Sequence, residues 1–164
     1  DPHFVETLVY VAEHDQHGTM GFILNRPTGQ HLRDILREES DVDHLLHQGP
    51  VYFGGPVKPQ NLFLVLFLRG DTAEDLRCQV NVPMEQMQAH LVNGTGWVRG
   101  YMGYAGWGEG QLDQEMDGHA WVVRKPHESL MSENPSPMMW SVFVGEDQLW
   151  RKLGPHLPPD PSTN

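Results

Sequence analysis

Cysteine is nearly absent from this chain of 164 residues, since Cys78 is its only thiol. One thiol forms no intramolecular disulfide and supplies too few ligands for a zinc ribbon or an iron–sulfur cluster. We therefore expect no metal centre, no bound cofactor and no redox pair built on cysteine. The lack of disulfides is also typical of proteins of a reducing compartment, and we expect a cytoplasmic location.

Basic residues are also scarce, because 11 Lys and Arg stand against 22 Asp and Glu, for a formal net charge of −11. Proteins that bind nucleic acid use clustered lysine and arginine to displace counterions from phosphates. The only adjacent basic residues here are the pairs Arg124-Lys125 and Arg151-Lys152. We therefore expect no tight direct contact with DNA.

Long apolar runs are missing as well. The longest, Leu62–Leu68, has seven residues, whereas a helix that crosses a membrane needs about 20. The first residues, Asp1–Phe4, hold no basic region followed by an apolar stretch. We expect neither a membrane span nor a signal peptide in this sequence.

Signatures of known catalytic and metal sites do not occur. The sequence contains no G-x-S-x-G, no G-x-x-x-x-G-K-[ST] and no H-E-x-x-H. Histidines spaced three apart, at positions 14 and 17 and at 44 and 47, have no obvious third ligand, so we expect them to be solvated. We expect the same of an acidic helix face formed by Glu109, Asp113 and Asp117.

Short alternating apolar segments, punctuated by glycine and proline, are present along most of the chain. They predict strands at 4–11, 20–25, 51–53, 62–68, 77–82, 97–105 and 120–123, and helices at 31–39, 84–93, 111–117 and 148–153. Because these elements intermix without a regular βαβ rhythm, we predict an α+β fold with a mixed sheet. The length suggests one domain, over residues 1–154, followed by a proline-rich tail at 155–164.

Two glycine clusters stand at the ends of predicted strands. In the first, Gly54-Gly55-Pro56 makes a sharp turn that either exposes backbone amides to a ligand or forms a tight corner of the sheet. The second is a predicted turn over 106–110, between a strand and a helix, where phosphates are often bound. The dinucleotide fingerprint fails there, because Gln111 stands where its third glycine belongs. The alternative is a packed turn with Trp107 in the core.

These clusters define a candidate ligand site. Its residues are Asn25, Arg26, Gly54, Gly55, Tyr104, Gly106, Trp107, Gly108 and Gln111. We predict no catalytic residue among them, and we expect both Gly55 and Gly106 to be needed for folding.

Several motifs together resemble one bacterial family. They are Asn25-Arg26-Pro27, the run from Val51 to Val57 (VYFGGPV), the run from Gly103 to Leu112 (GYAGWGEGQL), and Trp150 with Leu153-Gly154. The chain resembles the YqgE/AlgH family over most of its length. The resemblance implies a single domain with a bent or bifurcated sheet of barrel character, short flanking helices and a bacterial cytoplasmic protein. It implies no reaction, only a name as a transcriptional regulator linked to alginate production.

Three hypotheses about function follow. The first is a non-enzymatic regulatory or interaction protein that acts through a protein partner or a small effector. The second is a binder of a small nucleotide-like or phosphate-like molecule between the two glycine turns. The third is an unrecognised enzyme that uses Glu13, His14 or Arg26.

Overall fold

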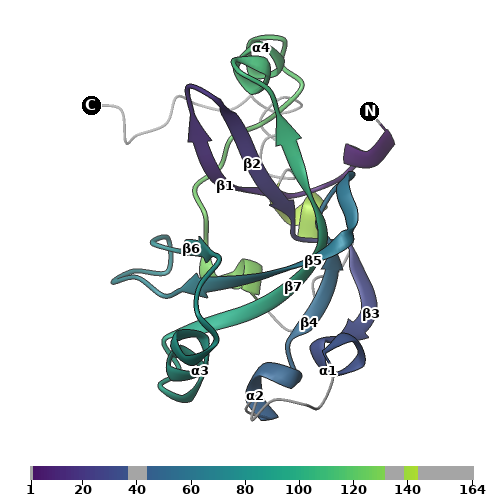
Figure 1. Cartoon of the computed structure of the whole chain (residues 1–164). Coiled ribbons are helices and arrows are strands. Elements are labelled where there is room, and N and C mark those ends of the chain that lie inside the picture. The colour runs from purple at the N-terminus through teal and green to yellow at the C-terminus, as the bar shows by residue number, and fades with distance from the viewer. Residues whose placement is uncertain (1, 37–43, 132–138, 144–164) are drawn as a thin grey trace, which may run out of the picture.

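One mixed sheet of seven strands dominates the computed structural model, which describes residues 2–36, 44–131 and 139–143 (Figure 1). The strands are β1 (Val9–Asp15), β2 (Gly18–Ile23), β3 (Pro27–His31), β4 (Pro50–Phe53), β5 (Val57–Leu68), β6 (Arg77–Val80) and β7 (Gly96–Trp107). The helices are α1 (Leu32–Ile35), α2 (His44–His47), α3 (Met84–Val92) and α4 (Gln111–Asp117), with 3-10 turns η1 (Pro2–Phe4) and η2 (Glu128–Met131). The predicted α+β class with a mixed sheet is confirmed.

Strand β7 organises the sheet because it pairs with three neighbours. It runs antiparallel to β5 along most of its length, parallel to β4 at its middle, and antiparallel to β2 at its end. The sheet therefore branches at β7, with β1 beyond β2, β3 beyond β4 and β6 beyond β5. The expected bifurcated sheet is confirmed, and the sheet does not close into a barrel.

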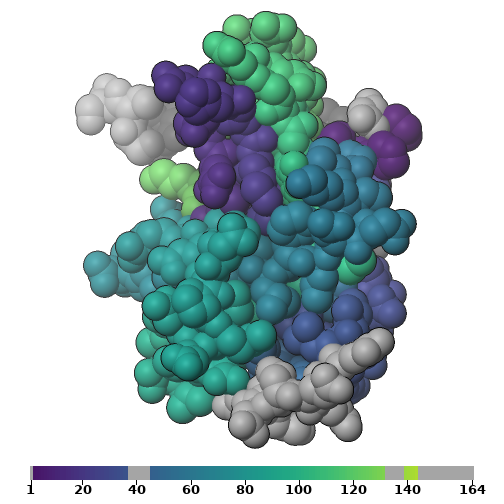
Figure 2. All heavy atoms as spheres, in the orientation of Figure 1, coloured from purple at the N-terminus to yellow at the C-terminus, as the bar shows by residue number. Residues whose placement is uncertain are grey.

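The core lies on both sides of β5 and β7. One cluster joins aromatic side chains of four strands, among them Phe22, Tyr52, Phe67 and Tyr101. A second lies under α1, α2 and α3, and a third lies under α4 around Trp107 and Leu112. Figure 2 shows the resulting elongated molecule, with the β1–β2 hairpin and α4 at one end and α3 at the other.

The first strand begins later than predicted. Phe4 lies in η1, and β1 starts at Val9 rather than at Phe4. The cause is Asn25, whose side chain accepts a hydrogen bond from the backbone N–H of Leu8 and donates one to the carbonyl of Glu6. Residues 5–8 thus form a loop that is held by a side chain instead of by a sheet ladder.

Other predicted boundaries also shift. Pro27 opens β3, which is not among the predicted strands; the first position of a strand suits a residue without an N–H. Gly106 lies within β7 and pairs with Met20, so the predicted turn over 106–110 shortens to 108–110. Residues 120–123 form no strand.

Most remaining elements agree with the sequence prediction. The opening hairpin, the strands around Val51–Phe53 and Leu62–Leu68, and the helices that precede Gly94 and Gly118 are confirmed. The helix predicted at 31–39 is shorter than expected, because His31 ends β3, α1 stops at Ile35 and Leu36 has an extended backbone with φ −78° and ψ 126°. The predicted helix at 148–153 and the tail at 155–164 lie outside the described residues. No helix in the described part of the chain is long and apolar enough to cross a membrane.

Candidate functional site

The first glycine cluster packs against the start of the second. A Cβ atom on Gly54 would lie 2.3 Å from the carbonyl oxygen of Gly103, and one on Gly55 would lie 2.3 Å from the backbone of Tyr104. The backbone N–H of Gly54 donates to Met102, and its carbonyl accepts from Ile23. The backbone of this turn therefore packs directly against the backbone of β7. Its N–H and carbonyl groups form hydrogen bonds at the junction of β2, β4 and β7.

The second cluster forms the turn that leads into α4. The side chain of Gln111 accepts a hydrogen bond from the Gly108 N–H at 3.0 Å and donates one to Glu115. Gly110 adopts a φ of +65°, a left-handed conformation that favours glycine. The N–H that a phosphate would use at Gly108 thus already has an acceptor within the chain.

The remaining predicted site residues have separate places. Asn25 is buried and, together with Arg26, which donates to the carbonyl of Val5, ties down the N-terminal loop. Tyr104 packs edge-on against Phe63. The nine predicted residues therefore lie in three groups, at the loop, at the β4–β7 junction and at the start of α4.

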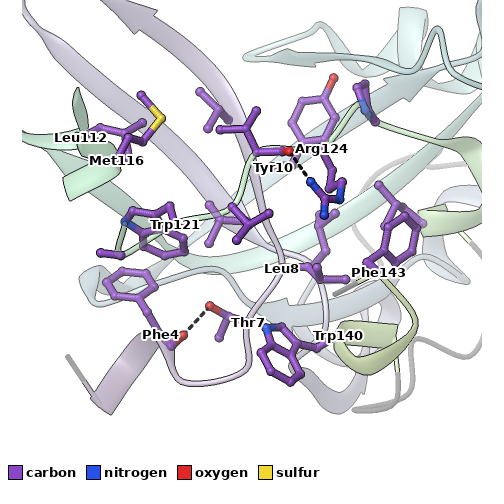
Figure 3. A pocket seen from close by; sticks show the side chains of 18 of the residues that line it. Phe4, Thr7, Leu8, Tyr10, Leu112, Met116, Trp121, Arg124, Trp140 and Phe143 are labelled. Atoms are coloured by element: carbon purple, nitrogen blue, oxygen red, sulfur yellow. Dashed lines mark hydrogen bonds between the residues drawn. The ribbon is translucent and has the colours of Figure 1, made fainter. Parts of the chain in front are cut away.

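A cavity of about 520 Å³ lies elsewhere, between β1, α4 and the segment 120–126 (Figure 3). Residues 139–143, which are helical, bring Trp140 and Phe143 to it from the opposite side. Of the nine predicted residues only Trp107 lines this cavity. Its walls come from four segments far apart in the sequence.

Three aromatic rings form one wall. Phe4 stacks on Trp107 at 5.8 Å between ring centroids and meets Trp121 edge-on at 5.5 Å. One carboxylate oxygen of Glu115 accepts hydrogen bonds from the indole N–H groups of both Trp107, at 3.0 Å, and Trp121, at 2.7 Å. These hydrogen bonds, Trp121 first, lower the pKa of Glu115 from its usual 4.5. A single carboxylate thus fixes both indoles of the wall.

The base of the cavity is apolar. Leu24, Leu112 and Leu130 line it from the buried side, and Tyr10 adds its ring. The Tyr10 hydroxyl donates to the carbonyl of Leu76 at 2.7 Å, and burial raises its pKa to about 12. Tyr10 is therefore neutral at physiological pH.

Cations and exposed valines mark the rim. Arg124 and Lys125 both line the cavity, and Lys125 pairs with Glu74 at 3.7 Å. Figure 3 shows Arg124 beside Tyr10, away from Phe4 and Trp121. The neighbouring Val122 and Val123 also line the cavity and are 43% and 71% exposed.

The described parts of the chain offer little support for a metal site or a reactive thiol. Within those ranges, no group of three His, Cys, Asp or Glu side chains could hold a metal ion. Burial raises the pKa of Cys78 to about 11, which leaves the thiol protonated at neutral pH. A ring nitrogen of His14 lies 2.6 Å from the hydroxyl of Thr19, its cross-strand partner in the hairpin, and the other lies 3.8 Å from a carboxylate oxygen of Asp113. The pairing of β1 with β2 accounts for the contact of His14 with Thr19.

Comparison with known proteins settles the family. The model of the AlgH-like family matches residues 1–149. This chain belongs to the AlgH-like family. The resemblance that the sequence motifs indicated is thereby confirmed.

Two AlgH-like relatives show the extent of the similarity. A UPF0301 protein of Methylococcus capsulatus is 34% identical over 158 residues, covering 90% of this chain and 84% of the relative. A UPF0301 protein of Streptomyces avermitilis is 31% identical over 174 residues, covering 100% of this chain and 89% of the relative. These names state no reaction and no ligand.

Solved structures share the AlgH-like fold. The solution structure of the AlgH protein from Pseudomonas aeruginosa superposes with a TM-score of 0.62 at 23% identity, covering 98% of this chain and 91% of that protein. A crystal structure of a protein from Corynebacterium diphtheriae superposes with a TM-score of 0.60 at 22% identity, covering 79% of this chain and 71% of that protein. At this identity the likeness establishes the architecture alone.

Sequence reasoning missed most of the cavity in this AlgH-like chain. Phe4 and Tyr10 looked like ordinary strand residues, and Trp121 looked like part of another strand. One signal was available, since Arg124-Lys125 is an adjacent basic pair directly after the apolar run Ala120–Val123. Such a junction of apolar and cationic residues is a feature of ligand sites as well as of strand ends.

Proposed function

We propose that this AlgH-like protein is a non-enzymatic regulatory protein that binds a small effector in the cavity between β1, α4 and residues 120–126. The observation that carries the proposal is the cavity itself. Its volume of about 520 Å³ falls within the roughly 300–1,000 Å³ of sites for small molecules. It also combines mostly apolar walls with a few polar groups, which is the usual composition of such sites.

The aromatic wall supports a specific site rather than a packing defect. Glu115 holds the indole N–H groups of Trp107 and Trp121, so both rings keep their orientation when no ligand is bound. A wall that is already ordered costs less entropy on binding than one that must be ordered by the ligand.

The exposed side chains at the rim of the cavity suit regulation through a protein partner. Val122 and Val123 are exposed apolar side chains next to the cavity, and exposed apolar groups beside a ligand site suit contact with another protein. A role in transcription would run through such a partner, because the net charge of −11 opposes close approach to DNA. We further propose that the protein works in the cytoplasm, where its single thiol stays reduced.

A phosphate-like ligand at the glycine turns has less support. The N–H groups of Gly54 and Gly108 both donate within the chain. The sequence-based site there remains a prediction that ligand screening would also test.

Thermal unfolding of the full chain with a panel of metabolites tests the proposal. A ligand at 100 times its Kd stabilises by about 2.7 kcal/mol, which for a domain of this size raises Tm by roughly 5–10 °C. Met116→Trp, which fills the cavity from α4, should abolish the shift. The matched control Met84→Trp, at the start of α3, should keep it. A shift that survives Met116→Trp, or no shift across the panel, would contradict the proposal.

A further inference from the structure

The charges around the cavity are distributed unevenly for so acidic a protein. Lys and Arg make up 11 residues of 164, yet two of them, Arg124 and Lys125, are adjacent and both line this cavity. Among the described residues that line it, Glu6 is the single carboxylate. Arg124 and Lys125 leave the apolar segment 120–123 together, so both belong to one end of it.

The cations and the carboxylate lie in different parts of the cavity. Glu6 belongs to the loop before β1, next to Thr7, whose hydroxyl donates to the carbonyl of Phe4. Figure 3 shows Phe4 and Thr7 together on one side and Arg124 on another, beside Tyr10. Arg124 thus lies away from Phe4 and Thr7, the labelled residues of the N-terminal loop to which Glu6 also belongs.

Neighbouring groups permit an anion at that end. The Tyr10 phenol is neutral because its pKa is about 12, so it adds no opposing charge. The ion pair of Lys125 with Glu74 is exposed, with side chains 84% and 62% accessible, and such pairs contribute little. A ligand carboxylate can therefore replace Glu74 at Lys125 with small loss.

We propose that the effector is an amphipathic anion: an apolar chain or ring of small-molecule size that carries one carboxylate. This inference rests on the proposed function and specifies its ligand class. The apolar body lies against Trp121 and Leu112, and the carboxylate lies at Arg124 and Lys125, where guanidinium and ammonium groups donate charge-assisted hydrogen bonds.

Three probes that share a ten-carbon alkyl chain and differ in their head group test this inference. Decanoate, decanol and decylamine are titrated into the full-length protein below their micelle concentrations. Calorimetry and the fluorescence of the cavity tryptophans measure binding. Decanoate should bind about tenfold more tightly than decanol, and decylamine more weakly than both. Among carboxylates from octanoate to dodecanoate, each added methylene should raise affinity about fourfold, because each buried CH₂ contributes about 0.8 kcal/mol.

Substitutions then assign the selectivity to the cations. The double variant Arg124→Gln, Lys125→Gln should lower decanoate affinity to that of decanol and leave decanol unchanged. A matched double variant, Arg33→Gln, Lys58→Gln, makes the same charge change at exposed residues of α1 and β5 and should leave all three affinities unchanged.

The outcomes separate the two proposals. Equal binding of decanoate and decanol, preference for decylamine, or selectivity that survives the Arg124→Gln, Lys125→Gln change would overturn the anion inference and leave the cavity standing. Binding of none of the three probes, with no change in tryptophan fluorescence, would count against the cavity as an apolar ligand site and so against both.

Discussion

At the scale of single residues, Glu115 holds the aromatic wall of the cavity in place. Its carboxylate links Trp107 and Trp121 and also accepts from Gln111, so it connects the end of β7, helix α4 and the segment that follows. Three donors on one carboxylate explain why the pKa of Glu115 is lowered although desolvation opposes the shift.

Glu115→Gln tests this role. The glutamine oxygen can still accept from one indole, but it lacks the charge that strengthens both hydrogen bonds. Because Glu115 is only partly buried, we expect a modest loss of about 1 kcal/mol, which lowers Tm by roughly 2–4 °C. Thermal unfolding and near-ultraviolet circular dichroism of the tryptophans measure it. An unchanged tryptophan signal would show that the carboxylate does not orient the indoles.

The pH dependence of that difference has a defined sign. The folded-state pKa of Glu115 is lower than the usual 4.5, so between the two values the unfolded chain binds more protons and stability rises with pH. The stabilising contribution is present above about pH 4.5 and is lost as pH falls through the lowered pKa. Wild type should therefore exceed Glu115→Gln at pH 6 and converge with it in acid. A gap that widens on acidification would contradict the assignment.

Asn25 is the second residue with a decisive local role. Its buried amide replaces a sheet ladder for the loop 5–8, which forms part of the cavity wall. Asn25→Ala leaves the Leu8 N–H and the Glu6 carbonyl without this partner, and we expect a loss of about 2–4 kcal/mol. The control is Asn93→Ala, at the exposed end of α3, which should change stability by less than about 1 kcal/mol. Chemical denaturation measures both, and equal losses would refute the clamp.

At the scale of elements, the two glycine clusters differ in how strictly their backbone requires glycine. Gly55 has a φ of +152°, and a Cβ there would lie 2.3 Å from the backbone of Tyr104. Gly106 lies in β7 at an exposed position, and its Cβ would meet only side chains, 3.1 Å from Tyr104 and 3.4 Å from Val57. We expected both glycines to be needed for folding because both stand in glycine-rich runs, but the packing supports that expectation for Gly55 alone.

Alanine at each position makes this contrast measurable. Gly55→Ala forces β4 away from β7 and should cost more than about 3 kcal/mol or prevent folding. Gly106→Ala should cost less than about 1 kcal/mol, because the Tyr104 ring can shift by a few tenths of an ångström. Equilibrium unfolding in urea compares the two. Similar stabilities would contradict the close packing of β4 on β7.

Elements that depend on local pattern could be predicted from the sequence. The Leu62–Leu68 run is apolar at every residue and forms the second half of β5, which begins at Val57. Helix α4 has Leu112 and Met116 four residues apart and Gly118 directly after it, and it is found where expected. The apolar composition of the run 120–123 predicts a strand as well, yet no strand in the described structure pairs with it. Pairing partners are a property of the tertiary structure, and they decide such cases.

At the scale of the whole molecule, the branched sheet creates the candidate site. The last residues of β7 pair with β2 beyond the point where β5 begins, and the cavity lies between β1, α4 and the segment that follows α4 (Figure 3). The cavity joins residues from positions 4 to 143, and no local motif contains that information. The sequence prediction therefore found the glycine residues that shape the sheet junction and missed the space beside it.

Native mass spectrometry of the gently purified, untagged chain, beside the same sample after denaturation, tests the central claim most directly. The account predicts a mass excess of small-molecule size in the wild type that disappears on denaturation. The excess should be absent from Met116→Trp and present in Met84→Trp. An apo mass for the wild type that persists after incubation with decanoate, or an excess retained in Met116→Trp, would contradict a ligand site in this cavity.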